Sequence, residues 1–264
     1  MILLSGGTGF IGKAICKELD NQGLEHYVLT RQPKQKNHIQ FDIFNFTESE
    51  LSVFAERKIS FIHCAWYVNH KDYQSSNQNQ KWHSASVNLV RLLSEYQLEH
   101  VTALGSCLEY ADNEKIKTNT SALSAHNQYS ASKIATQSDM RSLLKNKNIP
   151  FCWARIFYVY GKGEKKGRLV PLILNAKRKK EILLINNANA VIDLRHVEDV
   201  AKDVVYLSSQ KKDGEFNVSS GRGQTVQQIV KNFTTTEEYQ NYYAFAETRN
   251  NGLSVGINNV YSDN

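Results

Sequence analysis

The sequence predicts an α/β fold built around a parallel sheet, and three observations support this prediction. Short apolar runs recur along the chain, the first of them being MILLS at residues 1–5. Stretches with apolar residues at helical spacing follow these runs. A glycine-rich turn joins the first run to the first such stretch. Because apolar strands that alternate with helices form a parallel sheet covered on both faces, we expect a Rossmann-type, doubly wound sheet with a small interleaved C-terminal substrate lobe.

Each element follows from its own pattern. In FIGKAICKEL the apolar residues recur at helical spacing and predict a helix over residues 10–19, and Gly23 follows as a helix stop signal. The remaining strands are expected at 26–30, 59–65, 100–106, 151–161 and 214–220, and the remaining helices at 86–96, 129–145 and 196–209.

These elements divide the chain into two expected domains. Residues 1–160, joined by about 196–220, should form the Rossmann domain. Residues 161–195 and 221–264 should form the small lobe, because the regular alternation of strands and helices loosens there. The tail from residue 234 onward has weak periodicity and receives no assignment.

Composition limits the classes of protein to consider. The chain has 264 residues, 41% of them hydrophobic, and no apolar run approaches 18 residues, so we expect a globular protein without a membrane partner. The net charge of +6 fits a pocket for a polyanionic small molecule as well as it fits nucleic acid, and we expect no nucleic-acid partner. The four cysteines are dispersed without metal-ligand spacing, and no export signal precedes them. We therefore expect no metal site and reduced thiols in a cytoplasmic protein, and the sequence leaves a homodimer open.

The turn SGGTGFIG carries a candidate phosphate-binding site. Gly6, Gly9 and Gly12 recur every third residue between the first strand and the first helix. Glycines at such a turn allow a pyrophosphate to approach the backbone closely, and the N–H groups at the helix N-terminus favour an anion. We expect a dinucleotide at this turn, next to Phe10 and Ile11.

Arg31 indicates which dinucleotide is bound. It lies nineteen residues past Gly12, near the place where Rossmann folds carry an acid for the NAD ribose or an arginine for the NADP phosphate. A guanidinium pairs with a phosphate through two parallel hydrogen bonds, and Lys34 and Lys36 add positive charge. The sequence therefore predicts NADP(H), the alternative being an exposed surface arginine. Asp42 could cap a turn or accept a hydrogen bond from the adenine amine.

A candidate catalytic set lies on the next elements of the chain. Tyr129 and Lys133 are four residues apart on a predicted helix, so their side chains share one face. An ammonium near a phenol favours the phenolate, and we expect Lys133 to lower the pKa of Tyr129. Such a tyrosine can exchange a proton with a carbonyl oxygen, to which the strand-end Ser106 could also hydrogen-bond.

With these motifs in this order, residues 1 to about 233 resemble the extended short-chain dehydrogenase/reductases, the nucleotide-sugar epimerases, dehydratases and reductases. The resemblance rests on GGTGFIG, FDI, FIHCAW, SVNLVRLL, GSCLEY, YSASK, RIFYVYGKGE, LRHVEDVA and FNVSSG. It implies that Ser106, Tyr129 and Lys133 are the catalytic residues. Around the cofactor it implies roles for Asp42, Ile43, Ala65, Trp66 and Asn88, for Lys133 on the nicotinamide ribose, and for Phe157 near the nicotinamide amide.

At some positions this sequence departs from the family patterns, and these departures reduce the number of reactions that the resemblance allows. The 4,6-dehydratases carry an Asp–Glu pair where this chain has Cys107 and Leu108. The 3,5-epimerising members carry a cysteine and a histidine at the places of Leu108 and Leu169. The HCAW and GSCLEY stretches look like those of 4-ketoreductases such as CDP-abequose and CDP-paratose synthases. The resemblance thus favours NADPH-dependent reduction of a nucleoside diphosphate–4-keto-6-deoxyhexose, as in deoxysugar and surface polysaccharide biosynthesis.

Two other functions stay open. A 4-epimerase needs only the Ser–Tyr–Lys set and keeps its nicotinamide cofactor bound, and a third reading is an NADP-binding protein without catalysis. For the nucleotide-sugar partner we expect contacts from Cys107, Tyr158, Arg168 and Arg195. Many relatives place an arginine where this chain has Ile192, and the basic run KRKK at 177–180 is better explained as a solvated face.

Overall fold

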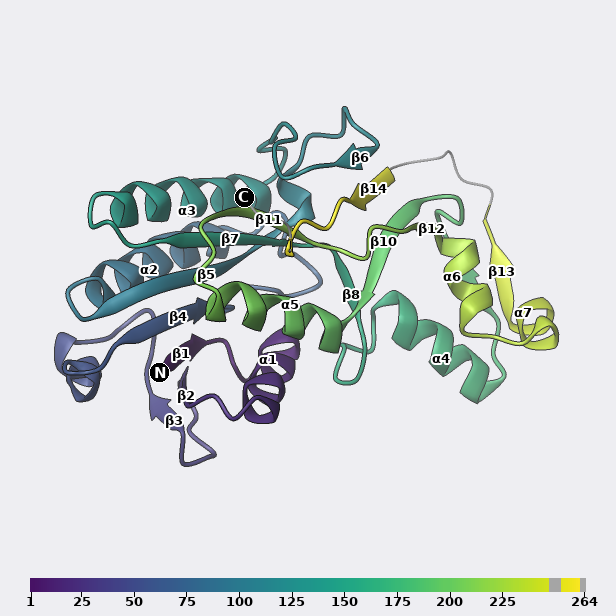
Figure 1. Cartoon of the computed structure of the whole chain (residues 1–264). Coiled ribbons are helices and arrows are strands. Elements are labelled where there is room, and N and C mark those ends of the chain that lie inside the picture. Colours follow the sequence, from purple (N-terminus) through teal and green to yellow (C-terminus); the bar gives the residue numbers. More distant parts are fainter. Residues whose placement is uncertain (247–252, 262–264) are drawn as a thin grey trace.

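A seven-stranded parallel sheet forms the centre of the molecule (Figure 1). The computed structural model describes residues 1–246 and 253–261. The strand order is β11-β7-β5-β4-β1-β2-β3, and every neighbouring pair runs parallel. The strands are β1 (Ile2–Ser5), β2 (His26–Thr30), β3 (His38–Gln40), β4 (Ile59–His63), β5 (Leu98–Ser106), β7 (Phe151–Ile156) and β11 (Gly214–Val218). This arrangement confirms the predicted Rossmann-type sheet.

Helices cover both faces of this sheet because its strands are apolar on both sides. On β1, Leu4 packs into a core cluster with one pair of helices, whereas Leu3 packs into a second cluster with the other pair. Helices α1 (Phe10–Asn21) and α5 (Val197–Ser209) pack together on the first face, and α2 (Gln78–Leu93) and α3 (Gln128–Lys145) on the second. None of the helices within the described residues is both long enough and apolar enough to cross a membrane.

A second, smaller sheet joins segments that lie far apart in the sequence. Its order is β12-β10-β14-β6, and β8 also pairs with β10. A separate pair, β9 and β13, lies beside three short helices with an apolar cluster of their own. The bounds are β6 (Ile116–Lys117), β8 (Tyr158–Tyr160), β9 (Leu183–Ile185), β10 (Val191–His196), β12 (Gly223–Thr225), β13 (Tyr243–Phe245), β14 (Leu253–Gly256), α4 (Leu169–Lys179), α6 (Val226–Asn232), α7 (Thr236–Tyr242), and the 3₁₀ helices η1 (Glu48–Phe54) and η2 (Cys107–Glu109).

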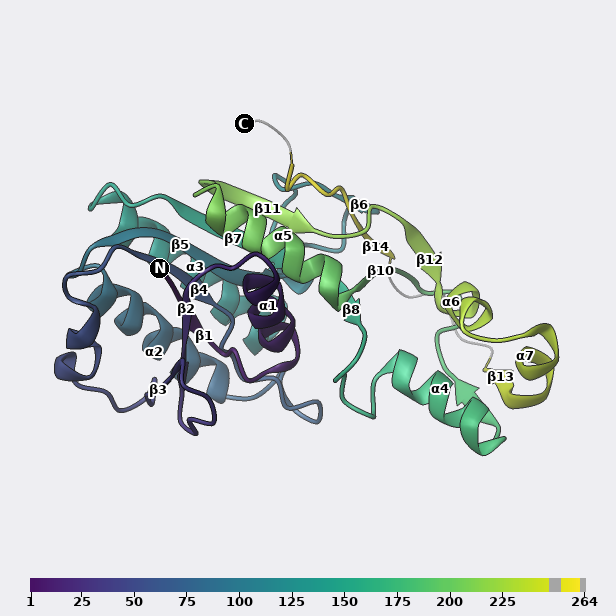
Figure 2. The same cartoon turned by 60° about the horizontal axis from the view of Figure 1, so that its bottom comes forward.

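The C-terminal tail, which the sequence left unassigned, divides between the two parts of the molecule: α7 and β13 lie in the small lobe, and residues 257–261 pack against the large sheet. After β14 the chain returns along β11 (Figure 2). There Asn259 Oδ1 accepts a hydrogen bond from Asn217 N at 2.7 Å. On α5, the Asp203 carboxylate accepts hydrogen bonds from Asn258 and Tyr261, and Val260 is fully buried. The tail therefore belongs to the folded core.

The topology also indicates where a ligand should bind. The strand order reverses between β1 and β4, so the chain leaves these neighbouring strands toward opposite faces of the sheet. In open α/β sheets the crevice at such a switch point, outside the carboxyl ends of the strands, holds the ligand. The glycine turn follows β1, Ala65 follows β4, and Ser106 ends β5 at this same edge.

Candidate active site

The glycine turn has the shape of a phosphate cradle. Gly6 has a φ of +74°, and a Cβ added there would lie 2.6 Å from Ala65 N. A Cβ on Gly12 would lie 2.1 Å from Gly6 O. There is therefore no room for a side chain at Gly6, where the turn meets the residues just after β4, or at Gly12, where α1 begins. The backbone of the turn and the backbone after β4 thus lie close together at the same edge of the sheet.

The start of α1 leaves its N–H groups available for an anion. Gly9 is the N-cap residue, and it offers no side chain to bond the first-turn N–H groups. Phe10 and Ile11 follow as the first helical residues and pack partly against the core. Because the turn excludes side chains and the helix end has no side-chain cap, these residues fit the pyrophosphate of a dinucleotide.

Arg31 directly follows the carboxyl end of β2, and it is exposed. Its backbone oxygen accepts a hydrogen bond from Gln40 Nε2 at 3.0 Å, which ties it to β3. Asp42, just past β3, accepts from Phe44 N at 3.1 Å, so the carboxylate caps a turn, and Ile43 packs against the core. Asp42 therefore caps a turn, which is one of the two roles predicted for it from the sequence.

Ser106 and Tyr129 meet at the carboxyl end of β5. Asn127 caps α3 by accepting from Ser130 N at 2.8 Å, which places Tyr129 in the first helical turn. The Tyr129 ring is held edge-on by Tyr73 at 5.2 Å and by Trp66 at 6.5 Å between ring centroids. Ser106 on β5 and Tyr129 on α3 thus lie within hydrogen-bonding distance of each other, and Tyr129 is almost fully buried.

The electrostatics of Tyr129 differ from the prediction. Burial raises the pKa of its phenol well above the ordinary value, and a hydrogen bond with the Ser106 side chain offsets part of that rise. The expectation that Lys133 lowers this pKa was wrong for this conformation. Lys133 Nζ lies 6.0 Å from the centre of the Tyr129 ring and donates instead to Leu104 O at 2.7 Å.

Lys133 lies in an apolar, aromatic environment. Its Nζ lies 3.8 Å from the centre of the Trp66 ring, and the Trp66 indole is fixed by donating to Asn79 Oδ1 at 2.9 Å. Burial lowers the pKa of Lys133 to about 8, and the negative charge of Glu109 opposes this shift. The ammonium is thus poised to lose its proton not far above neutral pH.

This buried ammonium should make stability depend on pH. The pKa of Lys133 falls from 10.5 to about 8 on folding, so between these values the folded state binds fewer protons than the unfolded state. Stability therefore rises with pH across that window. Between about pH 7.5 and pH 10, the free energy of unfolding of the wild-type protein should rise by about 1–3 kcal/mol relative to that of Lys133→Met. Urea denaturation of both proteins at each pH measures this difference. A difference that stays constant with pH would contradict this assignment.

The sequence reading missed Glu109, which is completely buried behind Ser106. Its Oε1 accepts from Ser106 N at 2.7 Å, and its Oε2 accepts from Trp153 Nε1 and Arg155 Nε, each at 2.8 Å. It therefore fixes the end of β5 against β7. A signal was available in SCLE, because a serine followed three residues later by a glutamate is the pattern of a capping box.

A cavity of about 470 Å³ opens beside Ser106, the first of the predicted catalytic residues. Cys107, which follows Ser106, lines it together with Tyr158 and Arg168, so three of the predicted substrate-binding residues meet here. Burial raises the pKa of the Tyr158 phenol, which keeps it protonated. The cavity extends to Ile192 in the smaller sheet and has a volume typical of small-molecule sites.

Two predicted site residues are placed elsewhere. Arg195 donates to both carboxylate oxygens of Asp203 on α5, at 2.6 and 3.0 Å, and also to Ser219 O. Its guanidinium is thus occupied within the protein and is not among the groups lining the cavity. Asn88 is exposed on α2, where it accepts from Arg91, because the helical period turns Ala85 and Leu89 inward instead.

The Phe157 ring packs inside the protein, next to residues that line the cavity. It is buried in a small cluster with Cys107 and Tyr110, and its centroid lies 6.4 Å from that of Tyr110. A Cβ on Gly256 would lie 2.5 Å from this ring, so the C-terminal segment closes over it. Phe157 thus supports the floor of the cavity through its ring.

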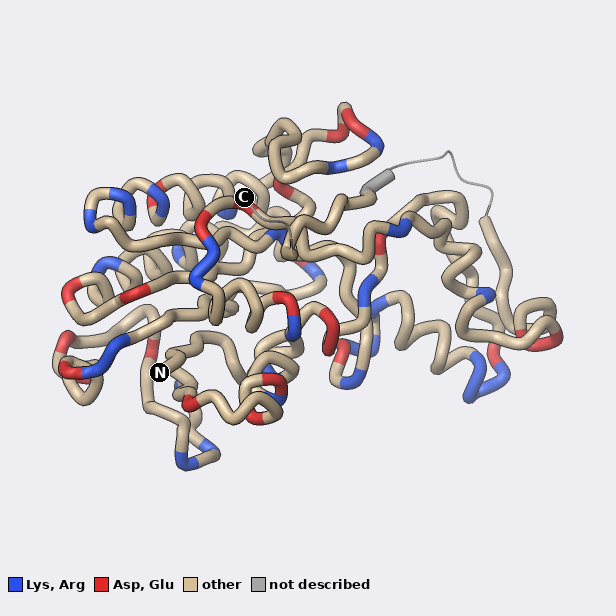
Figure 3. Tube along the Cα trace, in the orientation of Figure 1, with Lys and Arg blue, Asp and Glu red and all other residues tan. Residues whose placement is uncertain are grey.

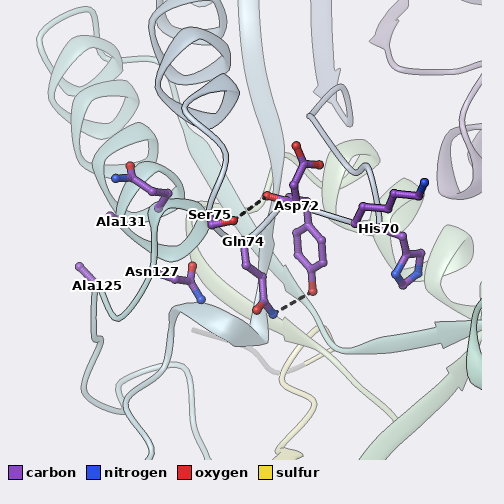
Figure 4. Close-up of a pocket in the computed structure, with 10 residues that line it drawn as sticks. His70, Asp72, Gln74, Ser75, Ala125, Asn127 and Ala131 are labelled. Carbon is purple, nitrogen blue, oxygen red and sulfur yellow. Dashed lines mark hydrogen bonds between the residues drawn. The ribbon is translucent and has the colours of Figure 1, made fainter.

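The segment of residues 70–75 forms a wall of the site. It borders a second hollow of about 610 Å³ at the start of α3 (Figure 4). Within it Tyr73 Oη is hydrogen-bonded by Gln74 Nε2 at 3.1 Å, while the Tyr73 ring faces Tyr129. His70 lines both hollows.

The run KRKK lies at the end of α4, far from the large sheet (Figure 3). Lys177 Nζ lies 2.9 Å from Glu238 Oε2, and Lys179 pairs with Glu181 at 3.6 Å. Its place on the chain and these ion pairs agree with the solvated face that the sequence indicated.

Known proteins resemble this chain over most of its length. A dTDP-6-deoxy-L-talose 4-dehydrogenase (NAD(+)) of Aggregatibacter actinomycetemcomitans is 22% identical in an alignment over 248 residues, and 88% of this chain and 88% of its own are covered. The solved UDP-N-acetylglucosamine 4-epimerase of Bacillus cereus has a TM-score of 0.81 at 20% identity and covers 97% of this chain and 86% of its own. The UDP-N-acetylglucosamine 4-epimerase of Methanobrevibacter ruminantium M1 has a TM-score of 0.83 at 17% identity, with 97% and 88% covered.

At these identities the solved structures establish the fold alone. The family is shown separately by a sequence model whose description is "NAD dependent epimerase/dehydratase family" and which matches residues 2–219. That match spans the large sheet, the glycine turn and the catalytic residues. The chain belongs to the NAD dependent epimerase/dehydratase family.

Proposed function

We propose that this protein reduces the C4 keto group of a nucleoside diphosphate–4-keto-6-deoxyhexose at the expense of NADPH. The observation that carries the proposal is that Ser106 and Tyr129 hydrogen-bond each other, with Lys133 nearby, beside a cavity that Cys107 and Leu108 line. Neither of these two supplies the acid and base that removal of a hydroxyl group needs. What remains is the movement of one hydride and one proton at a single carbon.

Different residues of the chain donate a proton to the C4 oxygen, hydrogen-bond it and supply positive charge near it. The bound nicotinamide supplies the hydride. Tyr129, kept protonated by burial, donates its proton to the developing alkoxide, and Ser106 hydrogen-bonds the same oxygen. Lys133, whose Nζ lies 6.0 Å from the centre of the Tyr129 ring, supplies positive charge in the same part of the site. Arg168 at the cavity wall faces the substrate diphosphate.

The relative from Aggregatibacter supports the reaction class. Its name describes oxidation at C4 of a 6-deoxysugar nucleotide, which is the chemical reverse of the reduction proposed here. That name also specifies NAD(+), whereas we assign NADPH to this chain on the strength of Arg31 alone. The cofactor preference is therefore tested separately.

Arg31→Ala should weaken NADPH binding by roughly tenfold to a hundredfold and NADH binding little, because hydrogen bonds to charged groups contribute about 1.5–3 kcal/mol. Arg31 is exposed at the end of β2, so its removal should leave the fold intact. Isothermal titration of both cofactors measures the effect. Arg222→Ala, which removes an exposed arginine from the smaller sheet, is the control for net charge. Equal weakening of both cofactors would show that Arg31 does not read the 2′-phosphate.

A second candidate is a nucleotide-sugar 4-epimerase that retains its cofactor. It is favoured by the names of similar structures, which include UDP-N-acetylglucosamine and UDP-glucose 4-epimerases. The same three residues can serve it, because an epimerase moves hydride and proton away from C4 and then back.

Cofactor consumption separates the two candidates. Purified protein is incubated with 4-keto and 4-hydroxy nucleotide sugars while NADPH absorbance is followed. For a reductase we expect one NADPH oxidised per keto sugar converted. Inversion at C4 of a hydroxy sugar without net cofactor change, together with inert keto sugars, would replace the reductase proposal by the epimerase.

A further inference from the structure

Glu164 lines the cavity and has an unsatisfied carboxylate oxygen. It lies between β8 and α4, its side chain is only 7% exposed, and Oε2 is buried without a hydrogen-bond partner. Oε1 lies 3.9 Å from Arg168 Nε, which is longer than a hydrogen bond. An unpaired polar group at this depth destabilises a protein, and a charged group more so than a neutral one.

Hydrogen bonds hold the backbone that carries Glu164. Glu164 N donates to Gly161 O at 3.2 Å, and Arg168 N donates to Lys165 O at 3.1 Å, so the segment before α4 forms consecutive turns. Lys165 Nζ donates to Val68 O at 3.0 Å and ties this segment to the chain just before the wall at residues 70–75. The backbone is thus anchored on both sides of Glu164.

The groups around Glu164 limit what it can bind. Arg168 and His70 line the same cavity. Burial and the positive charges of Arg168 and Lys165 lower the pKa of His70, which places these three groups near one another. A diphosphate would be attracted to these cations and repelled by the carboxylate. Burial raises the pKa of the Glu164 carboxyl group, and the charge of Arg168 opposes that rise. In its ionised form Glu164 accepts hydrogen bonds, and the donors that a nucleotide sugar carries in number are hydroxyl groups.

We propose that Glu164 Oε2 accepts a hydrogen bond from a sugar hydroxyl of the substrate and so selects ligands that carry this hydroxyl. The inference rests on the proposed nucleotide-sugar substrate and assigns a recognition group within its site. The hydroxyl belongs either to the hexose or to the nucleoside ribose. In both cases the ligand satisfies an oxygen that the protein itself leaves unpaired.

The test compares ligand binding by wild-type protein, Glu164→Gln and Glu164→Ala. Isothermal titration with NADPH present uses UDP, UDP-glucose, dTDP and dTDP-glucose as probes, and no turnover interferes because a reduced cofactor cannot take a hydride from a 4-hydroxy sugar. We expect Glu164→Ala to weaken binding of the sugar nucleotides by about tenfold to a hundredfold, and Glu164→Gln by less, because a neutral oxygen accepts more weakly. Glu181→Gln, an exposed carboxylate 65% open to solvent, is the matched control.

The pattern of loss identifies the hydroxyl. Weaker binding of UDP-glucose and dTDP-glucose with UDP and dTDP unchanged assigns a hexose hydroxyl, whereas equal loss for all four probes assigns the ribose. Wild-type affinity in both Glu164 variants overturns the inference while leaving the nucleotide-sugar function intact. Tighter binding in Glu164→Ala also overturns it, since the carboxylate would then act only by repelling phosphate. If wild-type protein binds none of the four, the proposed substrate class fails and the inference fails with it.

Discussion

Tyr129→Phe is expected to lower kcat by about 10²-fold or more and to leave NADPH affinity nearly unchanged, which is the usual scale for losing a positioned acid. The variant removes only the phenolic oxygen. The edge-on contacts of the ring with Tyr73 and Trp66 do not need that oxygen, so the fold and the site wall should persist. Steady-state kinetics with NADPH and a 4-keto nucleotide sugar, together with cofactor titration, measure both quantities.

The neighbouring phenol provides the control. Tyr73 lies 5.2 Å from Tyr129 between ring centroids, and its hydroxyl is hydrogen-bonded by the side chain of Gln74. Tyr73→Phe should therefore retain most of the turnover. Near-normal turnover in Tyr129→Phe would remove this residue from the mechanism, and equal losses in both variants would indicate a general disturbance of the wall.

Local sequence patterns were enough to predict the large sheet. Its inner strands contain apolar runs, whereas the edge strand β3 (HIQ) does not. The glycine turn after β1 and the helix cap before Tyr129 use short-range chemistry. Such signals survive in a single sequence because they depend on residues only a few positions apart. Local patterns also placed Ser106 at the end of a strand and Tyr129 at the start of a helix. In a parallel sheet the carboxyl ends of the strands lie at one edge, and the helices that follow the strands begin there.

The missed features depend on contacts between distant residues. Val260 in the tail is fully buried, yet nothing near it in the sequence shows which surface covers it. Arg195 resembles a free phosphate ligand until α5 brings Asp203 to it. Asn88 lies within a motif that suggested the cofactor path, but its helical phase turns it to solvent. The raised pKa of Tyr129 likewise reflects burial, which spacing alone does not give.

Arg155→Met is expected to lower the free energy of unfolding by about 3–5 kcal/mol, because removing one partner of a buried ion pair leaves the other charge uncompensated. Arg155 is 1% exposed, and its Nε lies 2.8 Å from the fully buried Glu109 Oε2. Without the guanidinium, Glu109 keeps only neutral donors, Trp153 Nε1 and Ser106 N. Urea denaturation at neutral pH measures the loss.

A double variant separates the charge from the packing. Glu109→Gln with Arg155→Met removes both charges while an amide oxygen can still accept from Ser106 N, so we expect it to recover much of the loss. The solvent-exposed ion pair of Arg57 and Glu25 is the control, and Arg57→Met should change stability far less than Arg155→Met. A loss in Arg155→Met as small as that of Arg57→Met would show that the pair is not a structural charge pair. Equal losses in the single and double variants would mean that the Arg155 side chain stabilises the site by packing alone. The expected recovery instead makes Glu109 the charge that Arg155 neutralises, directly behind the serine that the proposed reaction uses.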